Sequence, residues 1–156
     1  MLDKRKFYID GKWVSPSKPN DLEVINPSTE EAFATISLGS KEDTNSAVSA
    51  AKKALVTWCQ SSKEERINLL EKLLDIYKKR YSEMTEAISM EMGAPMDWSN
   101  DAQTSSGQSH LEDFIVRLKE FKFDEQFSTE SNNRICYEPI GAVSYTHLTL
   151  PTNREV

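Results

Sequence analysis

Apolar residues recur at helical spacing through most of the region between residues 41 and 121, and this periodicity limits the fold more than any other feature. Two stripes follow a serine that stands three residues before an acidic residue, a variant of the capping box that starts helices. They predict helices over 41–60 and 63–80. The serine–acid pairs are Ser40 with Asp43 and Ser62 with Glu65. The stripes consist of Ala47, Val48, Ala51, Ala54, Leu55 and Trp58, and of Ile67, Leu70, Leu73, Leu74, Tyr77 and Tyr81.

Two further helices follow. The third is predicted to end near residue 92, because Gly93 suits the residue after a helix and Pro95 cannot continue it. The fourth is predicted over 97–121 as one long helix, weakened by a polar stretch at 103–107.

Short strands flank this helical region. Asp-Gly at positions 10 and 11 stands between two β-prone runs and predicts a hairpin over 7–14, because both turn residues need a positive φ. Two more strands are predicted around 22–25 and 33–38, and alternating residues predict a strand over 134–141 that is exposed on one face. The chain is therefore expected to begin with a small antiparallel unit and to continue as helices.

Charge and length exclude several classes of protein. With 156 residues the chain allows one domain or a piece of something larger. Its net charge of −6 argues against a nucleic-acid partner, because the basic stripe of such proteins is missing. It has neither an apolar run of about 18 residues nor an N-terminal apolar segment, which predicts a cytoplasmic protein without a membrane partner.

Few residues have sequence neighbours that indicate a catalytic or ligand-binding role. Cys59 and Cys136 have neither a CxxC partner nor a nearby histidine, so each is interpreted as a reduced, small buried hydrophobe. His110 lies among polar helix residues and is interpreted as solvated, and His147 is not expected to be catalytic. The sequence contains neither GxGxxG nor GxxxxGK[ST], the two common phosphate-binding loops.

The order of several motifs resembles the N-terminal part of the NAD(P)-dependent aldehyde dehydrogenase superfamily. The strand that ends in Glu138-Pro139-Ile140-Gly141 resembles the one that precedes that family's Thr-Pro-Trp-Asn cofactor loop. The other motifs, in chain order, are Tyr8-Ile9-Asp10-Gly11-Lys12-Trp13-Val14, Val24-Ile25-Asn26-Pro27-Ser28-Thr29-Glu30, Ala47-Val48 followed by Ala50-Ala51, Ala54 and Trp58, then Arg66, and Glu91-Met92-Gly93-Ala94-Pro95.

The resemblance implies an α/β fold, of which this chain holds a fragment. Residues 1–123 would be the N-terminal part of the nucleotide-binding domain, a β-hairpin unit with about four helices. Residues 124–143 would begin the oligomerisation flap with its first strand. Residues 144–156 are interpreted as a non-native tail, because residues 143–152 read as the translation of a transposon-end sequencing adapter. A genuine divergent C-terminus is the alternative.

The resemblance also implies an activity for the intact enzyme, which is the oxidation of an aldehyde to a carboxylic acid with NAD or NADP. A cysteine nucleophile would form a thiohemiacetal and then a thioester, and a glutamate would act as the base for hydrolysis. The family places these groups after Gly141, so no catalytic or cofactor-binding residue is assigned here and the chain alone is expected to be inactive. The intact enzyme is expected to be a homo-oligomer.

One site is expected on the fragment itself. Family members hold a structural Na⁺ or K⁺ through backbone carbonyls before the Asn-Pro pair and an acidic residue before the helix-ending glycine. These positions match Val24, Ile25 and Glu91, and oxygen ligands suit a hard cation. Glu91 as an ordinary surface carboxylate is the alternative.

A different class of function stays open at this point. The same helices could form a small stand-alone binding module without enzymatic activity, whose apolar faces contact a partner. A longer reading frame with Thr-Pro-Trp-Asn after Gly141 and a downstream cysteine would favour the enzyme.

Overall fold

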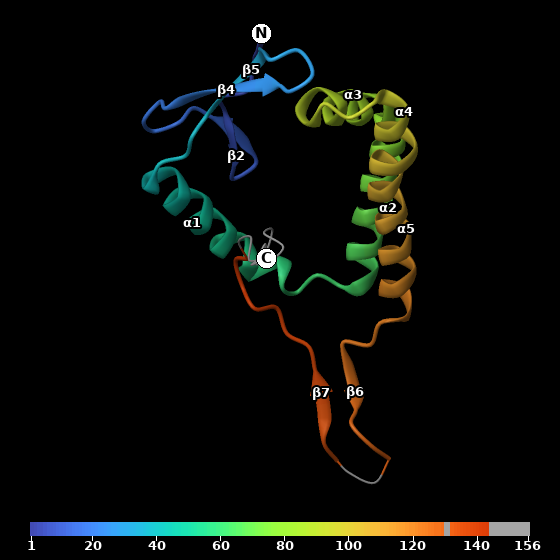
Figure 1. Ribbon diagram of the computed structural model, residues 1–156. Helices are drawn as coiled ribbons and strands as arrows, with labels where there is room; N and C mark the ends of the chain where they lie inside the picture. The colour runs from blue at the N-terminus through green and yellow to red at the C-terminus, as the bar shows by residue number, and fades with distance from the viewer. Residues whose placement is uncertain (130–131, 144–156) are drawn as a thin grey trace, which may run out of the picture.

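The computed structural model describes residues 1–129 and 132–143, and Figure 1 shows its elements as an open arc. The tail predicted for 144–156, with His147, lies outside the described residues. The strands are β1 (Leu2–Asp3), β2 (Phe7–Ile9), β3 (Lys12–Val14), β4 (Asp21–Asn26), β5 (Glu31–Ser37), β6 (Asp124–Gln126) and β7 (Arg134–Cys136). The helices are α1 (Lys41–Trp58), α2 (Lys63–Lys79), α3 (Tyr81–Met92), α4 (Met96–Trp98), the π-helix η1 (Ser99–Thr104) and α5 (Ser105–Glu120).

The N-terminal strands form two small sheets. β2 and β3 pair as the predicted hairpin, in which Asp10 and Gly11 take the positive φ values of 52° and 75° that the turn requires. β4 and β5 pair in antiparallel fashion, and β1 adds to β5 in parallel. The sequence analysis did not predict β1, which is only two residues long. A β-bulge shifts the β4–β5 register between Val24 and Ile25.

Both predicted capping boxes are present. The Asp43 amide donates to the Ser40 hydroxyl at 3.2 Å, and the Asp43 carboxylate accepts from the Ser40 amide at 2.9 Å. Hydrogen bonds from the amides of Ser40 and then Ser17 lower the pKa of Asp43 below its ordinary value of 3.8. Because the folded-state pKa is lowered, this stabilisation is present at neutral pH and is lost as the pH falls through the lowered pKa.

Replacing Ser40 by alanine should therefore loosen the first turn of α1. Loss of one N-cap side chain costs about 1 kcal/mol, which corresponds to about fivefold faster exchange of the amides that it protects. Hydrogen exchange of the Asp43 amide in the intact protein would measure this. The matched control is Ser46→Ala, because Ser46 is exposed within the same helix. Equal exchange rates in the two variants would contradict the role of the cap.

The core lies between α2 and α5, which run side by side in Figure 1. Ile67, Ile115 and Leu118 are buried, and Leu70, Leu74 and Phe123 pack against them. Trp58, which the helical pattern placed on the apolar stripe of α1, is 47% exposed. None of the helices in the described part of the chain is long and apolar enough to cross a membrane.

The region predicted as one helix over 97–121 is divided into α4, η1 and α5, and a buried polar network holds the π-helix. The hydroxyls of Thr85 and Thr104 lie 3.0 Å apart, and the Tyr77 hydroxyl donates to the Thr104 carbonyl at 2.9 Å. The Tyr81 hydroxyl donates to the Asn100 carbonyl at 2.6 Å. The Thr85–Thr104 pair is buried, the Tyr77 bond is partly buried and the Tyr81 bond is exposed, and together these tertiary contacts stabilise the interruption.

The last described element is a hairpin that extends away from the helices (Figure 1). β7 pairs in antiparallel fashion with β6, a strand of polar residues that the sequence analysis did not predict. The predicted strand over 134–141 is shorter than expected and ends at Cys136. As predicted, one side of β7 is exposed, since Arg134 and Cys136 face solvent while Ile135 is half-buried.

Candidate functional site

A cavity of about 660 Å³ lies between the β4–β5 sheet and helices α2 and α3. Its apolar wall includes Phe33, Ile36, Leu73, Ile76, Met84, Ala87 and Met90. Three carboxylates of α3 stand along it, from Glu83, Glu86 and Glu91. Arg80 forms an ion pair with Glu83 at 2.7 Å, which lowers the pKa of that carboxyl through the hydrogen bond.

The predicted cation ligands are brought together in part. Val24 of β4 and Glu91 of α3 line this same cavity, although they are far apart in the sequence. Ile25 is not among the lining residues, and its side chain is 46% exposed. The β-bulge between Val24 and Ile25 interrupts the strand ladder at the position where the carbonyl ligands were predicted.

The end of α3 is held close to the turn that follows β4. The Ser28 hydroxyl donates to the Gly93 carbonyl at 3.3 Å. Gly93 has a φ of 67°, and a Cβ atom at this position would lie 2.8 Å from the Pro27 ring and 2.9 Å from the Ser28 hydroxyl. Only glycine suits both the backbone conformation and this close approach. The contact therefore fixes the last turn of α3, which carries Glu91, beside the end of β4.

The described side chains that line this cavity include three carboxylates and neither a histidine nor a cysteine. Within residues 1–129 and 132–143, no group of three or more histidine, cysteine, aspartate or glutamate side chains is placed to hold a metal ion. The oxygen donors among the lining side chains include the carboxylates of Glu83, Glu86 and Glu91, and carboxylate oxygens are ligands that hard cations prefer.

The two cysteines lack the surroundings of a nucleophile. The half-buried Cys59 thiol lies 3.5 Å from the Val56 carbonyl of its own helix. Cys136 is exposed, so its interpretation as a buried hydrophobe was wrong, because within residues 1–129 and 132–143 the two-stranded hairpin has no second layer over this side chain. Its hydrogen bond to Asp124 raises the pKa of the thiol and so opposes thiolate formation. His110 is exposed on α5, as predicted.

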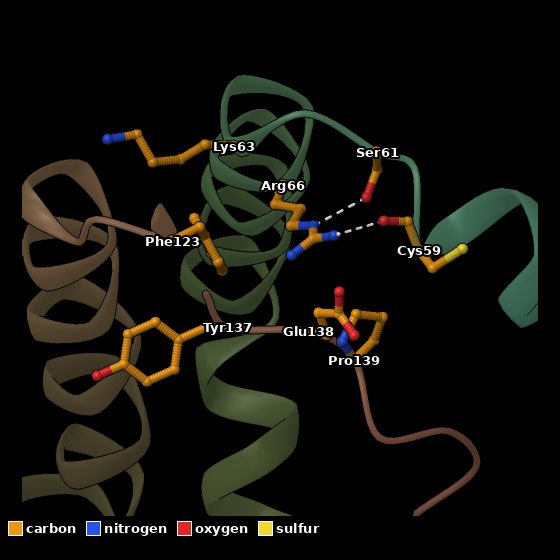
Figure 2. A pocket seen from close by; sticks show the side chains of 8 residues that line it. All are labelled: Cys59, Ser61, Lys63, Arg66, Phe123, Tyr137, Glu138 and Pro139. Atoms are coloured by element: carbon orange, nitrogen blue, oxygen red, sulfur yellow. Dashed lines mark hydrogen bonds between the residues drawn. The ribbon is translucent and has the colours of Figure 1, made fainter. Parts of the chain in front are cut away.

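A second cavity, of about 380 Å³, lies where the end of α1, the start of α2 and the base of the β6–β7 hairpin meet. Figure 2 shows Arg66 at its centre, with its guanidinium group directed toward Ser61 and the Cys59 carbonyl. The lining residues are Cys59, Ser61, Lys63, Arg66, Phe123, Tyr137, Glu138 and Pro139. Arg66 carries no local sequence signal for this position beyond its place in a motif, because the segments that meet at the cavity are distant in the chain.

Comparison with curated proteins gives consistent matches. The chain is 38% identical over 142 residues to 3-succinoylsemialdehyde-pyridine dehydrogenase of Pseudomonas sp, which is 90% of this chain. It is 37% identical over 155 residues, 99% of its length, to a putative aldehyde dehydrogenase of Staphylococcus epidermidis. The matches cover 29% and 32% of those relatives, so the chain spans about a third of their length.

Solved structures show the same fold. An aldehyde dehydrogenase of Bartonella henselae superposes with a TM-score of 0.83 at 55% identity, covering 85% of this chain and 28% of the other. A variant of aldehyde dehydrogenase C of Pseudomonas syringae, solved with NAD⁺ and octanal, gives a TM-score of 0.77 at 33% identity and covers 80% of this chain and 26% of the other. These likenesses confirm the α/β fold class and the fragment predicted from the sequence.

The family assignment rests on most of the chain. The model that describes the aldehyde dehydrogenase family matches residues 13–146, which include the Arg66 cavity and all of the other cavity's lining except Leu2 and Lys4. The chain therefore belongs to the aldehyde dehydrogenase family.

Proposed function

We propose that this chain is the N-terminal part of an oxidoreductase that oxidises an aldehyde to a carboxylic acid with NAD⁺ or NADP⁺. The observation that carries the proposal is the family match over residues 13–146. The structural relative from Pseudomonas syringae, which was solved with NAD⁺ and octanal, supports the cofactor and the class of substrate. In the intact enzyme a cysteine would form the thiohemiacetal and thioester, and the nicotinamide, when bound, accepts the hydride.

The chain by itself is not expected to hold the dinucleotide. Its sequence has no glycine-rich phosphate loop of known spacing, and the resemblance places the cofactor loop after Gly141. The parts that the chain supplies are the scaffold over residues 1–123 and the start of the oligomerisation flap over 124–143. This division is supported by the end of α5 at Glu120 and the beginning of β6 at Asp124. A homo-oligomer in the cytoplasm belongs to the same proposal.

The isolated chain should therefore show no aldehyde oxidation, whereas the intact protein should reduce NAD⁺ or NADP⁺ when an aldehyde is added. The measurement is reduced nicotinamide, formed over a blank without aldehyde, for both proteins with the same panel of aldehydes. Reduced nicotinamide from the isolated chain would contradict the placement of the catalytic groups after Gly141. A folded intact protein that reduces neither cofactor with any aldehyde would contradict the proposed reaction.

The cavity between β4 and α3 is proposed as a structural Na⁺ or K⁺ site with ligands from Val24, Ile25 and Glu91. The support is that Val24 and Glu91 line one cavity and that the β-bulge interrupts the ladder beside Val24. A bound ion would join the strand unit to α3, and it would stabilise the fold by an amount that rises with the logarithm of the free cation concentration once this exceeds the Kd.

Replacing Glu91 by glutamine should weaken this cation about tenfold or more, because the only negatively charged ligand is lost. The melting temperature of the intact protein, measured in potassium or sodium chloride against choline chloride, reports the binding. The matched control is Glu86→Gln, since Glu86 lies on the same helix and lines the same cavity. An equal cation effect in both variants would show that Glu91 is an ordinary surface carboxylate.

A further inference from the structure

We propose that Arg66 is a positioning residue that fixes the direction in which the β6–β7 hairpin leaves the helix pair α2–α5. The hairpin extends beyond the helices in Figure 1, so its direction depends on the contacts at its base. Arg66 stands at that base, where its side chain contacts the end of α1 and the loop after it as well as Phe123, and the residues that follow β7 line the same cavity.

The guanidinium group makes two kinds of contact at once. Its Nε donates to the Ser61 hydroxyl at 2.8 Å, and a terminal nitrogen lies 3.5 Å from the Cys59 carbonyl oxygen (Figure 2). Its central carbon lies 5.8 Å from the centroid of the Trp58 ring and 5.3 Å from that of Phe123, both within the range of cation–π attraction. A planar group with several donors can satisfy all of these contacts together, whereas an ammonium group cannot.

Phe123 transmits the position of Arg66 to both strands of the hairpin. It directly precedes β6, and its carbonyl accepts a hydrogen bond from the Tyr137 amide at 2.8 Å, just after β7. The Phe121 ring packs against Phe123 at 4.9 Å and against Tyr137 at 5.1 Å between ring centroids. A shift of Phe123 would therefore move the entry and the exit of the hairpin together.

The same turn of α2 also fixes the end of α5. The Lys63 ammonium donates to the carbonyls of Lys119 at 2.8 Å and Phe121 at 3.3 Å. These are carbonyls at the C-terminal end of α5, where a positive charge is favourable. Lys63 thus fixes where the helix stops, and Arg66 fixes the aromatic residue that begins the next segment. Because Lys63 holds the end of α5 and Arg66 holds Phe123, loss of Arg66 should free the hairpin and leave the helix pair α2–α5 in place.

The direction of the hairpin decides where its exposed apolar side chains are presented. Phe127, Tyr137 and Ile140 are exposed, with Ile140 at 93%. In the homo-oligomer proposed above, this segment belongs to the flap that joins subunits, and the consequence for assembly rests on that proposed function. If the hairpin samples several orientations, only a fraction of the molecules can assemble at any time. The apparent affinity between subunits is then reduced by that fraction.

The test uses the intact protein as wild type, Arg66→Met, Arg66→Lys and the control Arg117→Met. Arg117 is exposed on α5 and forms an ion pair with Asp113 of the same helix. Hydrogen exchange of the Tyr137 amide and of the amides of Ile67 and Ile115 is measured by NMR or mass spectrometry. For Arg66→Met we expect about 5- to 30-fold faster exchange at Tyr137 with unchanged core amides. Arg66→Lys should give an intermediate increase, and the control should give none.

A dilution series in the analytical ultracentrifuge then measures assembly. We expect Arg66→Met to dissociate at a concentration about fivefold or more above that of the wild type, with the control unchanged. Unchanged exchange at Tyr137 in Arg66→Met would overturn the proposal. Faster exchange at Tyr137 and in the core to the same extent would also overturn it, because it would show a general loss of stability. If Arg66→Met does not fold, the exchange of Arg66→Lys at Tyr137 and at the core amides tests the proposal in the same way.

The outcomes separate this inference from the proposed function. A wild-type protein that stays a monomer at all concentrations would contradict the proposed homo-oligomer, while the exchange at Tyr137 would still decide the role of Arg66. A wild-type oligomer whose Arg66 variants assemble and exchange like the control would contradict the inference and leave the proposed oligomer in place.

Discussion

Replacing Ile67 by alanine is expected to destabilise the intact protein by about 2–5 kcal/mol, the range for removing a large aliphatic side chain from a packed core. Ile67 is 3% exposed and belongs to the cluster in which α2 meets Ile115 and Leu118 of α5. The substitution would leave a cavity between two helices, because Ile67 is the residue that α2 buries in this cluster. The measurement is the midpoint and slope of denaturant unfolding, compared with the wild type.

The matched control for this change is Leu69→Ala, two residues along the same helix. Leu69 is 52% exposed, and truncating it removes a similar volume without opening a cavity. We expect a change within about 0.5 kcal/mol, as for other surface substitutions. Equal losses in the two variants would mean that a part of the intact protein outside this chain covers Leu69, and that the α2–α5 contact is not the dominant core here.

The local features of the fold were predictable from the sequence, because neighbouring residues determine them. Ser40 with Asp43 and Ser62 with Glu65 form the capping boxes that their spacing indicated. Asp10-Gly11 gives the hairpin because its conformation is set within four residues. In each case the interacting residues lie within a few positions of each other, so a short sequence pattern contains both partners of the contact.

Features that depend on distant segments were missed or only partly predicted. The π-helix at Ser99–Thr104 depends on hydrogen bonds from Tyr77 and Thr85, which the helical period of its own segment cannot show. The polar stretch noted at 103–107 was the one local sign of it. β6 is a run of Asp, Glu and Gln, and it forms a strand because β7 pairs with it.

The candidate site shows the same limit. The resemblance proposed Val24, Ile25 and Glu91 as ligands, and two of the three line one cavity although the sequence separates them widely. The Arg66 cavity had no comparable signal, because its groups come from three segments and each has an ordinary role locally. Long-range convergence of this kind requires a structure or an alignment of co-varying positions.

The largest effect is expected for the chain on its own, which should be molten or aggregated in solution. Within the described residues, the buried apolar side chains are those of Ala34, Ile67, Ile115 and Leu118. Many large apolar side chains on the helices are exposed instead, including Val56, Trp58, Leu73, Ile76, Met84, Phe114 and Val116. Contiguous apolar surface of more than a few hundred Å² is unusual on a monomer and marks an interface or an aggregation hazard.

The same chain should nevertheless keep its helices, because both capping boxes and the amphipathic pattern are local. We therefore expect a helical far-UV circular dichroism signal, strong binding of a hydrophobic dye and no cooperative thermal transition. The control is the intact protein, in which the remaining two thirds of the polypeptide would cover these faces and give a sharp transition with little dye binding. A monodisperse monomer of the isolated chain with a sharp transition would contradict the prediction, and it would favour a stand-alone binding module over a fragment of an enzyme.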